Sequence, residues 1–315
     1  MSKLTQIDLA TCRKVGQGVK RPEDVVVGRD GTVWISDQLS ACARIGADGQ
    51  LVRVGQAGGA PNGINMDREG RILIANFGGP DTGYGPLQRL DPNTGVVDTL
   101  CAEIGGRKLF GANYPVCDSA GRIWCSHSTW GPVNEAFAGK NDGLIFRCDP
   151  DGRVVVLAEG IRFANGIALD AQEQNLYVCE TTGCDVLRYA IQPDGSLAAP
   201  VRHGPVLGLT VQEVQDRRPL TAGLRSQLGA TDGCGFDVEG NLWVTLVMAN
   251  KIVAITPAGE MVTVLSDPDG KLMRSPTNVS WGGADMCDLY IGSIASDYVV
   301  HARSPVPGLP LVHQR

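Results

Sequence analysis

Oxygen-bearing side chains recur ahead of short apolar segments along this chain of 315 residues. Five of the stretches that carry them read "RPEDVVV", "APNGINMD", "GANYPVCD", "FANGIALD" and "ATDGCGFD". Carboxylate and amide oxygens are the donors that hard divalent cations such as Ca²⁺ prefer. Whether they form one site depends on whether the fold brings them together. With a sixth, degenerate copy, the residues concerned are Glu23, Asn62, Asn113, Asn165, Asp232 and Asn278.

Two of these stretches contain Asn-Gly, which is the strongest short signal for a β-hairpin. The residues before Asn165 form a poor strand, so a hairpin is a poor explanation there. Asn, Asp and Gly are also common turn formers where a strand begins. For Asn62 and Asn278 the turn interpretation stays open, whereas Glu23 follows Pro22 and is of a type rarely chosen for turns.

The elements around these residues repeat. Similar segments begin near residues 21, 60, 111, 163, 230 and 275, and after most of them comes a second hairpin with a turn such as Asp-Gly. Each unit is expected to form four short strands. A four-stranded unit of about 40–50 residues that is repeated radially is a propeller blade. We predict an all-β, six-bladed β-propeller in which residues 1–315 form one domain. The alternatives are a β-sandwich or a solenoid, and the strands of a sandwich would not repeat as a self-similar four-strand unit.

The propeller supplies a reason for the recurring oxygens. The first strand of each blade lines the central channel, so the residue at its start points toward the axis at one end. Glu23 and Asp232 would repel each other in a dry channel, and a cation between them would remove that cost. We therefore predict one divalent cation on the axis, most simply Ca²⁺, with Mg²⁺, Mn²⁺ and Zn²⁺ as alternatives.

Composition limits the other functions. The formal charge is −6 with no long run of either sign, so we expect no binding to nucleic acid or to an anionic membrane. The ten cysteines form no C-x-x-C pair, and several lie in apolar strand-like runs. With no membrane-length apolar stretch and no signal-peptide core at the start, we expect a cytoplasmic protein with reduced thiols.

The ordered motifs "RPEDVVV", "GANYPVCDSAGRIWCS", "FANGIALD" and "TDGCGFDVEGNLWVT" resemble the senescence marker protein/gluconolactonase/luciferin-regenerating-enzyme family over roughly residues 15–300. The resemblance implies a six-bladed propeller with an axial divalent metal, and an activity that is often lactone hydrolysis. It implies that Glu23, Asn113, Asn165 and Asp232 hold the metal. It also implies that Asp232 is the catalytic acid or base.

The chain departs from the family pattern near the site. Sugar lactonases of the family usually carry Arg-x-Asn-Asp where this chain has "GANY", so the sugar-gripping arginine is missing and Tyr114 replaces an acid. Two insertions, 128–142 and 201–230, are expected to cover the metal end of the channel and to shape a pocket. Aromatic candidates for its wall are Phe77, Tyr84 and Trp130.

We interpret the protein as a metal-dependent hydrolase of a small-molecule lactone, in which the metal polarises the carbonyl and Asp232 acts on the attacking water. Asn62 and His127 are predicted to bind substrate, His127 because imidazole transfers protons near neutral pH, unless it is simply a packed loop residue. Two alternatives remain. One is another metal-assisted reaction, phosphotriester hydrolysis or a lyase or cyclase step, and the other is a calcium-binding propeller without catalysis.

Overall fold

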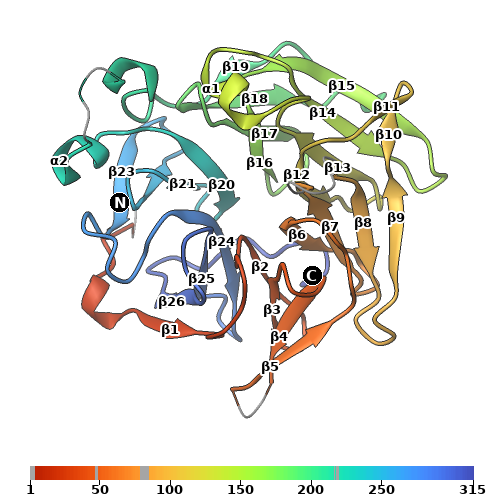
Figure 1. Ribbon diagram of the computed structural model, residues 1–315, viewed down its shortest axis with the longest axis horizontal. Coiled ribbons are helices and arrows are strands. Elements are labelled where there is room, and N and C mark those ends of the chain that lie inside the picture. Colours follow the sequence, from red (N-terminus) through yellow and green to blue (C-terminus); the bar gives the residue numbers. More distant parts are fainter. Residues whose placement is uncertain (1–3, 47–48, 79–84, 216, 218–219) are drawn as a thin grey trace.

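The computed structural model describes residues 4–46, 49–78, 85–215, 217 and 220–315. Six four-stranded antiparallel sheets are arranged around a central axis, as Figure 1 shows in a view along that axis. This confirms the predicted six-bladed β-propeller.

Each blade runs from an inner strand to an outer strand in chain order, except that the last blade takes its outer strand from the other end of the chain. Blade 1 contains β2 (Val25–Val27), β3 (Val33–Ser36), β4 (Cys42–Ile45) and β5 (Leu51–Val54). Blade 2 contains β6 (Pro61–Met66), β7 (Ile72–Asn76), β8 (Leu87–Leu90) and β9 (Val97–Cys101). Blade 3 contains β12 (Ala112–Cys117), β13 (Ile123–His127), β14 (Gly143–Cys148) and β15 (Val154–Ile161). Blade 4 contains β16 (Ala164–Leu169), β17 (Asn175–Glu180), β18 (Asp185–Ala190) and β19 (Val201–Arg202). Blade 5 contains β20 (Thr231–Phe236), β21 (Leu242–Leu246), β22 (Lys251–Ile255) and β23 (Met261–Ser266). Blade 6 contains β24 (Pro276–Gly282), β25 (Asp288–Ser293), β26 (Val299–Arg303) and β1 (Arg13–Val15).

The circle of blades is closed by strand β1, which pairs antiparallel with β26, with Arg13 opposite His301 and Val15 opposite Val299. Pairing the two ends of the chain covers an edge that would otherwise present free backbone groups.

Helices are short and lie outside the blades. Among the described residues, the α-helices are α1 (Val133–Phe137) and α2 (Ala222–Arg225), and the 3₁₀ segments are η1 (Leu9–Thr11) and η2 (Gln212–Val214). Both α-helices fall in the two insertions that the sequence singled out. A further hairpin, β10 (Glu103–Ile104) with β11 (Arg107–Lys108), extends from blade 2. No helix in the described part of the chain is long and apolar enough to cross a membrane.

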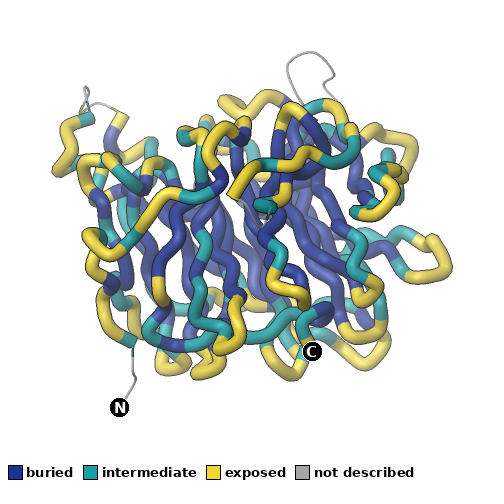
Figure 2. Tube along the Cα trace, turned by 90° about the horizontal axis from the view of Figure 1, so that it is seen from below, coloured by how far each residue is buried: buried dark blue, intermediate teal, exposed yellow. Residues whose placement is uncertain are grey.

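The core is divided among the interfaces between neighbouring blades. Blades 1 and 2, for example, share a cluster that includes Trp34 and Ile74, and blades 5 and 6 share one that includes Trp243 and Trp281. Figure 2 shows the strands as a buried band between two ends of exposed loops. Burial of these apolar faces holds each blade against the next and thereby fixes where the inner strands begin. All ten cysteines are free, and eight of them are buried.

In blades 2 to 5 an aspartate ends the inner-strand motif and organises the turn that follows. In blade 3, Oδ1 of Asp118 accepts hydrogen bonds from the backbone N–H groups of Ala120 and Arg122, and Oδ2 accepts one from the Trp124 indole. Asp237 repeats the pattern in blade 5 with Trp243. These aspartates stabilise turns at the end opposite the strand entries.

Candidate metal and substrate site

The candidate site begins at a β-bulge that recurs in the inner strands. In blade 3, Ala112 pairs with His127 and Pro115 with Cys125, so Asn113 and Tyr114 together face the single residue Ser126. The pairings of β6, β16 and β20 shift at the same point, which places Asn62, Asn165 and Asp232 in the same position as Asn113. A bulge turns a side chain away from the regular alternation of a strand.

Hydroxyl groups on the second strand compensate for the ladder bonds that the bulge interrupts. The Tyr114 N–H donates to Oγ of Ser126 at 3.0 Å, and the Gly233 N–H donates to Oγ1 of Thr245 at 3.0 Å. In blade 1 the Asp24 N–H donates to Oγ of Ser36 at 3.0 Å. The bulged backbone is therefore hydrogen-bonded although it is buried.

Blade 6 corrects one sequence assignment. Pro276 pairs with Ser293 and Val279 with Ile291, so the position equivalent to Asn165 is Thr277, and Asn278 is one residue further along. The Thr277 hydroxyl donates to the Glu23 carbonyl at 2.5 Å. Aligning the motifs on the apolar residue after the bulge, Val279 with Ile167, would have identified Thr277 from the sequence.

The glycines after Asn62, Asn165 and Asp232 are needed for close approach and not for a turn. None of Gly63, Gly166 and Gly233 has a positive φ, and all three lie inside inner strands. A Cβ atom on each would lie 2.6 Å from the Asn113 carbonyl oxygen, 2.7 Å from that of Asp232 and 2.5 Å from that of Thr277, respectively. The Asn-Gly and Asp-Gly pairs thus mark where neighbouring inner strands converge near the axis.

The side chains at the strand entries, namely Glu23, Asn62, Asn113, Asn165 and Asp232, surround the channel and are called the ring below. Glu23 and Asn62, together with Arg21, form one half of the ring. Glu23 is 5% exposed, and Nη2 of Arg21 lies 3.2 Å from its Oε2, too poorly aligned to count as a hydrogen bond. The same Nη2 donates to Oδ1 of Asn62 at 2.8 Å. The Asn62 amide then donates to the Asn113 carbonyl at 3.2 Å, which links blade 2 to blade 3.

Asp232 and Asn165 form the other half. The Asn165 side chain hydrogen-bonds Asp232, and its amide also donates to Oγ1 of Thr181 at 3.0 Å. Burial raises the pKa of Asp232 well above its usual value, and the nearby Glu23 carboxylate raises it further. Burial likewise raises the pKa of Glu23, partly offset by Arg21 and Asn62. Glu23 belongs to blade 1 and Asp232 to blade 5, far apart in the sequence. The fold brings their carboxylates close enough to interact electrostatically.

The donor set fits a hard divalent cation. Oε2 of Glu23 and Oδ1 of Asn113 are buried and make no hydrogen bond within the described part of the chain. The Asn113 amide donates to Oγ of Ser128 at 2.9 Å, and this contact fixes which end of the amide is left free. Among the residues that the structure describes, Oδ1 of Asn113 has no donor, and Oε2 of Glu23 has an ion pair with Arg21 but no hydrogen bond. A cation would satisfy these oxygens and relieve the repulsion between the Glu23 and Asp232 carboxylates. Among the described residues no three His, Cys, Asp or Glu side chains gather together, because half of this set consists of amides.

Beneath the ring lies a second group of polar side chains, which the sequence did not predict as a cluster. Asp24, Tyr114 and Asn278 occupy the bulge position that is glycine in the other three blades. The Asn278 amide donates to Oδ1 of Asp24 at 2.6 Å and to the Tyr114 hydroxyl at 2.9 Å. Backbone N–H groups of Val25 and Ile64 also donate to Asp24, although burial raises its pKa to about 8. This cluster forms the floor of the site.

Comparison with known proteins agrees with the fold. Residues 61–295 match the SMP-30/Gluconolactonase/LRE-like region. The chain belongs to this family. The 6-deoxy-6-sulfogluconolactonase of Pseudomonas putida is 26% identical over 176 residues, which cover 56% of this chain and 51% of that protein. The pentonolactonase XacC of Haloferax volcanii is 27% identical over 186 residues, 59% of this chain and 54% of that protein. The matched part thus spans about half the length of these curated relatives. A solved gluconolactonase from Xanthomonas campestris superposes with a TM-score of 0.71 at 18% identity, covering 96% of this chain and 94% of that one.

In this family member, the wall that usually carries an arginine is apolar. A Cβ on Gly111 would lie 3.3 Å from Cε2 of Phe77, so the Phe77 ring covers the place where such a side chain would begin. The Phe163 ring lies 6.3 Å from Phe77 and 5.9 Å from Phe137 between centroids. Tyr84, which the sequence also offered for this wall, lies outside the described residues.

Both insertions contribute to the mouth of the site. A hollow of about 250 Å³ is lined by Phe137 from the first insertion and by Thr210 and Gln212 from the second. The Gln212 amide donates to the Phe137 carbonyl at 3.4 Å. Thr181, which bonds Asn165, also lines this hollow and connects it with the ring.

His127 does not face this pocket. It is fully buried, and Nε2 accepts hydrogen bonds from the N–H groups of Phe110 at 3.2 Å and Gly111 at 3.1 Å. Its ring packs on Trp130 at 4.2 Å between centroids, and burial lowers its pKa to about 3. The geometry favours a neutral imidazole that holds the loop before Asn113, and it does not support the predicted contact with substrate.

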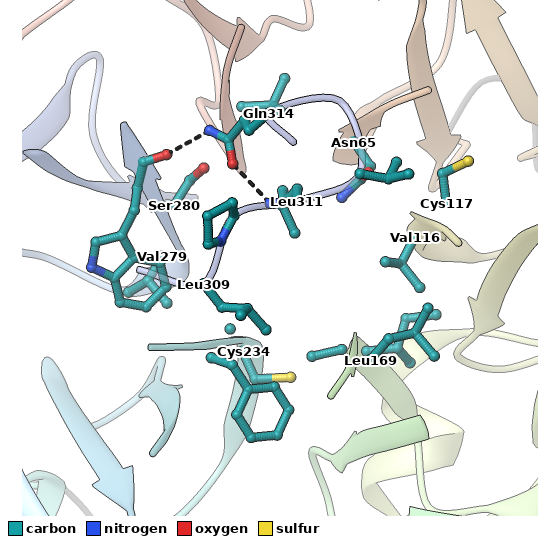
Figure 3. Close-up of a pocket in the computed structure, with 18 of the residues that line it drawn as sticks. Asn65, Val116, Cys117, Leu169, Cys234, Val279, Ser280, Leu309, Leu311 and Gln314 are labelled. Carbon is teal, nitrogen blue, oxygen red and sulfur yellow. Dashed lines mark hydrogen bonds between the residues drawn. The ribbon is translucent and has the colours of Figure 1, made fainter. Parts of the chain in front are cut away.

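The other end of the channel is closed. Residues 309–315 lie across it and, together with inner strands, surround an apolar cavity of about 60 Å³ (Figure 3). The Gln314 amide donates to the carbonyls of Val27 at 3.1 Å and Trp281 at 3.0 Å, and its Oε1 accepts from the Leu311 N–H at 2.9 Å. Access to the ring is therefore from the end that bears the insertions.

Proposed function

We propose that this protein is a divalent-metal-dependent hydrolase that opens a small-molecule lactone. The observation that carries the proposal is a pair of buried oxygens that make no hydrogen bond to the described residues, Oδ1 of Asn113 and Oε2 of Glu23, which is ion-paired with Arg21, beside Asp232 at the open end of the channel. The names of the family relatives, among them a sulfogluconolactonase and a pentonolactonase, support a lactone as the substrate.

Glu23, Asn113, Asn165 and Asp232 would hold the cation, and their oxygen chemistry suits Ca²⁺ best. Once bound, the cation supplies Lewis-acid polarisation of the ester carbonyl. Ser128 and Thr181 orient the amides of Asn113 and Asn165 so that their carbonyl oxygens are left for the site. Asn62 lies in the same ring, tied to Arg21 and Asn113, where it can position substrate.

Asp232 would take a proton from the attacking water or orient that water. Burial and the Glu23 carboxylate raise the pKa of Asp232, and a cation held by Glu23 and Asp232 would lower it again. The carboxylate would then be available as a base at neutral pH. General-base assistance of this kind is typically worth about 10²–10⁴ in rate.

The test combines metal content, binding and turnover. Purified protein is examined by elemental analysis, by calorimetric titration with Ca²⁺ after treatment with EDTA, and on a panel of lactones. We expect one cation per chain, loss of lactone hydrolysis with EDTA and recovery with Ca²⁺. Asp232→Asn should lose at least 100-fold in kcat and bind Ca²⁺ more weakly, whereas Asp98→Asn, an exposed carboxylate on β9, should behave like wild type. Cation binding without turnover of any lactone would contradict the hydrolase and favour a metal-binding protein.

A further inference from the structure

A cleft of about 630 Å³ lies beside the ring, where blade 1 meets blade 6. Its lining is rich in cationic side chains, namely Lys20, Arg21, Lys271 and Arg274, whereas Asp297 is the acid among the lining residues. This local excess of positive charge contrasts with the chain as a whole, which carries a formal charge of −6. A concave surface lined by one sign of charge concentrates ligands of the opposite sign.

Arg21 belongs to both the cleft and the ring. Its guanidinium contacts Asn62 and Glu23, as described above, and Nη1 also donates to the Pro61 carbonyl at 3.3 Å. The backbone of Arg21 has φ of +52°, a left-handed conformation that is unfavourable for a side-chain-bearing residue. A ligand group in the cleft would therefore lie next to a ligand group at the ring, with Arg21 between them.

Two other cations of the cleft are free to bind. In the described part of the chain, neither the Lys20 ammonium nor the Arg274 guanidinium has a hydrogen-bond or ion-pair partner, whereas Lys271 pairs with Asp269 at 2.9 Å. The backbone around Arg274 is fixed. Its carbonyl accepts the Ser293 hydroxyl at 2.5 Å, and the following Ser275 N–H donates to Oδ1 of Asn250 at 2.8 Å.

We propose that this cleft binds a second, ionised group of the substrate, so that the lactone opened at the ring carries a carboxylate or a comparable oxyanion. The inference rests on the proposed lactonase activity and deepens it. Arg274 and Lys20 bind the anion, and Arg21 separates it from Glu23. The aromatic wall formed by Phe77, Phe137 and Phe163 packs against the uncharged part of the substrate.

The test uses two lactones that differ only in charge: a five-membered lactone bearing a carboxylate on the ring, and the same lactone with a primary carboxamide in its place. The variants are Arg274→Gln and Lys20→Gln with Arg274→Gln. Arg68→Gln is the matched control, because Arg68 follows the inner strand β6 of blade 2 and so lies at the end of the propeller opposite the strand entries and the cleft. All are assayed loaded with Ca²⁺.

Wild type should prefer the carboxylate over the carboxamide about tenfold in kcat/KM, mostly through KM, as expected for one charge-assisted contact. The double variant should lose this preference while hydrolysing the carboxamide at the wild-type rate, and Arg68→Gln should keep it. An equal preference in wild type and the double variant would overturn the inference and leave the lactonase intact. If no lactone is hydrolysed, the proposed function fails. Calorimetric binding of the same two compounds then tests whether the cleft binds an anionic group. Selective binding of the carboxylate that depends on Arg274 would support this role, and the absence of such selectivity would refute it.

Discussion

Replacing Gly233 by alanine tests how the site is assembled. The backbone of Gly233 has no positive φ, so alanine can adopt its conformation and the effect is steric. The added Cβ would lie 2.5 Å from the Thr277 carbonyl oxygen, about 1 Å inside ordinary contact. The Oδ1 of Asn278 would lie closer still, and this buried side chain is held by Asp24 and Tyr114. Because the obstacles are the backbone of β24 and a fixed side chain, β20 and β24 must separate. Overpacking of this kind costs typically about 1–3 kcal/mol, and we expect the upper end.

A loss of about 3 kcal/mol should lower Tm by roughly 6 °C in a domain of this size. It should also weaken Ca²⁺ binding, since Asp232 would move with its strand. Urea unfolding, thermal melting and calorimetry measure these effects. Gly223→Ala in α2 is the control, because no atom lies within 4 Å of its Cβ position and alanine favours a helix. A Gly233→Ala protein with the wild-type Tm and Ca²⁺ affinity would refute the view that these glycines allow the inner strands to converge.

The remaining predictions concern buried titratable groups. Since the pKa values of Glu23 and Asp232 are raised, the cation-free folded protein keeps protons that the unfolded chain releases above about pH 4. Its free energy of unfolding should therefore fall as pH rises from about 4, by less when Ca²⁺ is present, and urea titrations at pH 5 and 8 measure this. His127→Ala should cost about 1–3 kcal/mol, because it leaves two buried N–H groups without an acceptor, yet retain kcat near wild type. A 100-fold loss of kcat in a stable variant would restore a catalytic role. Asp24→Asn places an amide against donors from Ile64 and Asn278, so the free energy of unfolding, measured by chemical denaturation, should fall by about 1–3 kcal/mol. Unchanged stability would contradict the stabilising role given to Asp24 in the floor.

The sequence by itself determined the architecture. Repetition of one four-strand unit indicates a propeller because each blade can bury its faces only against another blade. The repeat also marked the strand entries, and with them Glu23, Asn62, Asn113, Asn165 and Asp232. These positions were predictable because one place in the unit always faces the same channel.

Only the tertiary structure decided what surrounds those entries. Asp24, Tyr114 and Asn278 come from three different blades, and only the packing of the blades brings these side chains together in the floor. His127 ends a strand beside aromatic residues, and nothing in its local sequence shows whether it faces a pocket or, as found, the backbone of residues 110–111. Arg21 contacts Asn62 across two blades. Contacts between distant segments depend on how the blades pack, and a local repeat does not specify them.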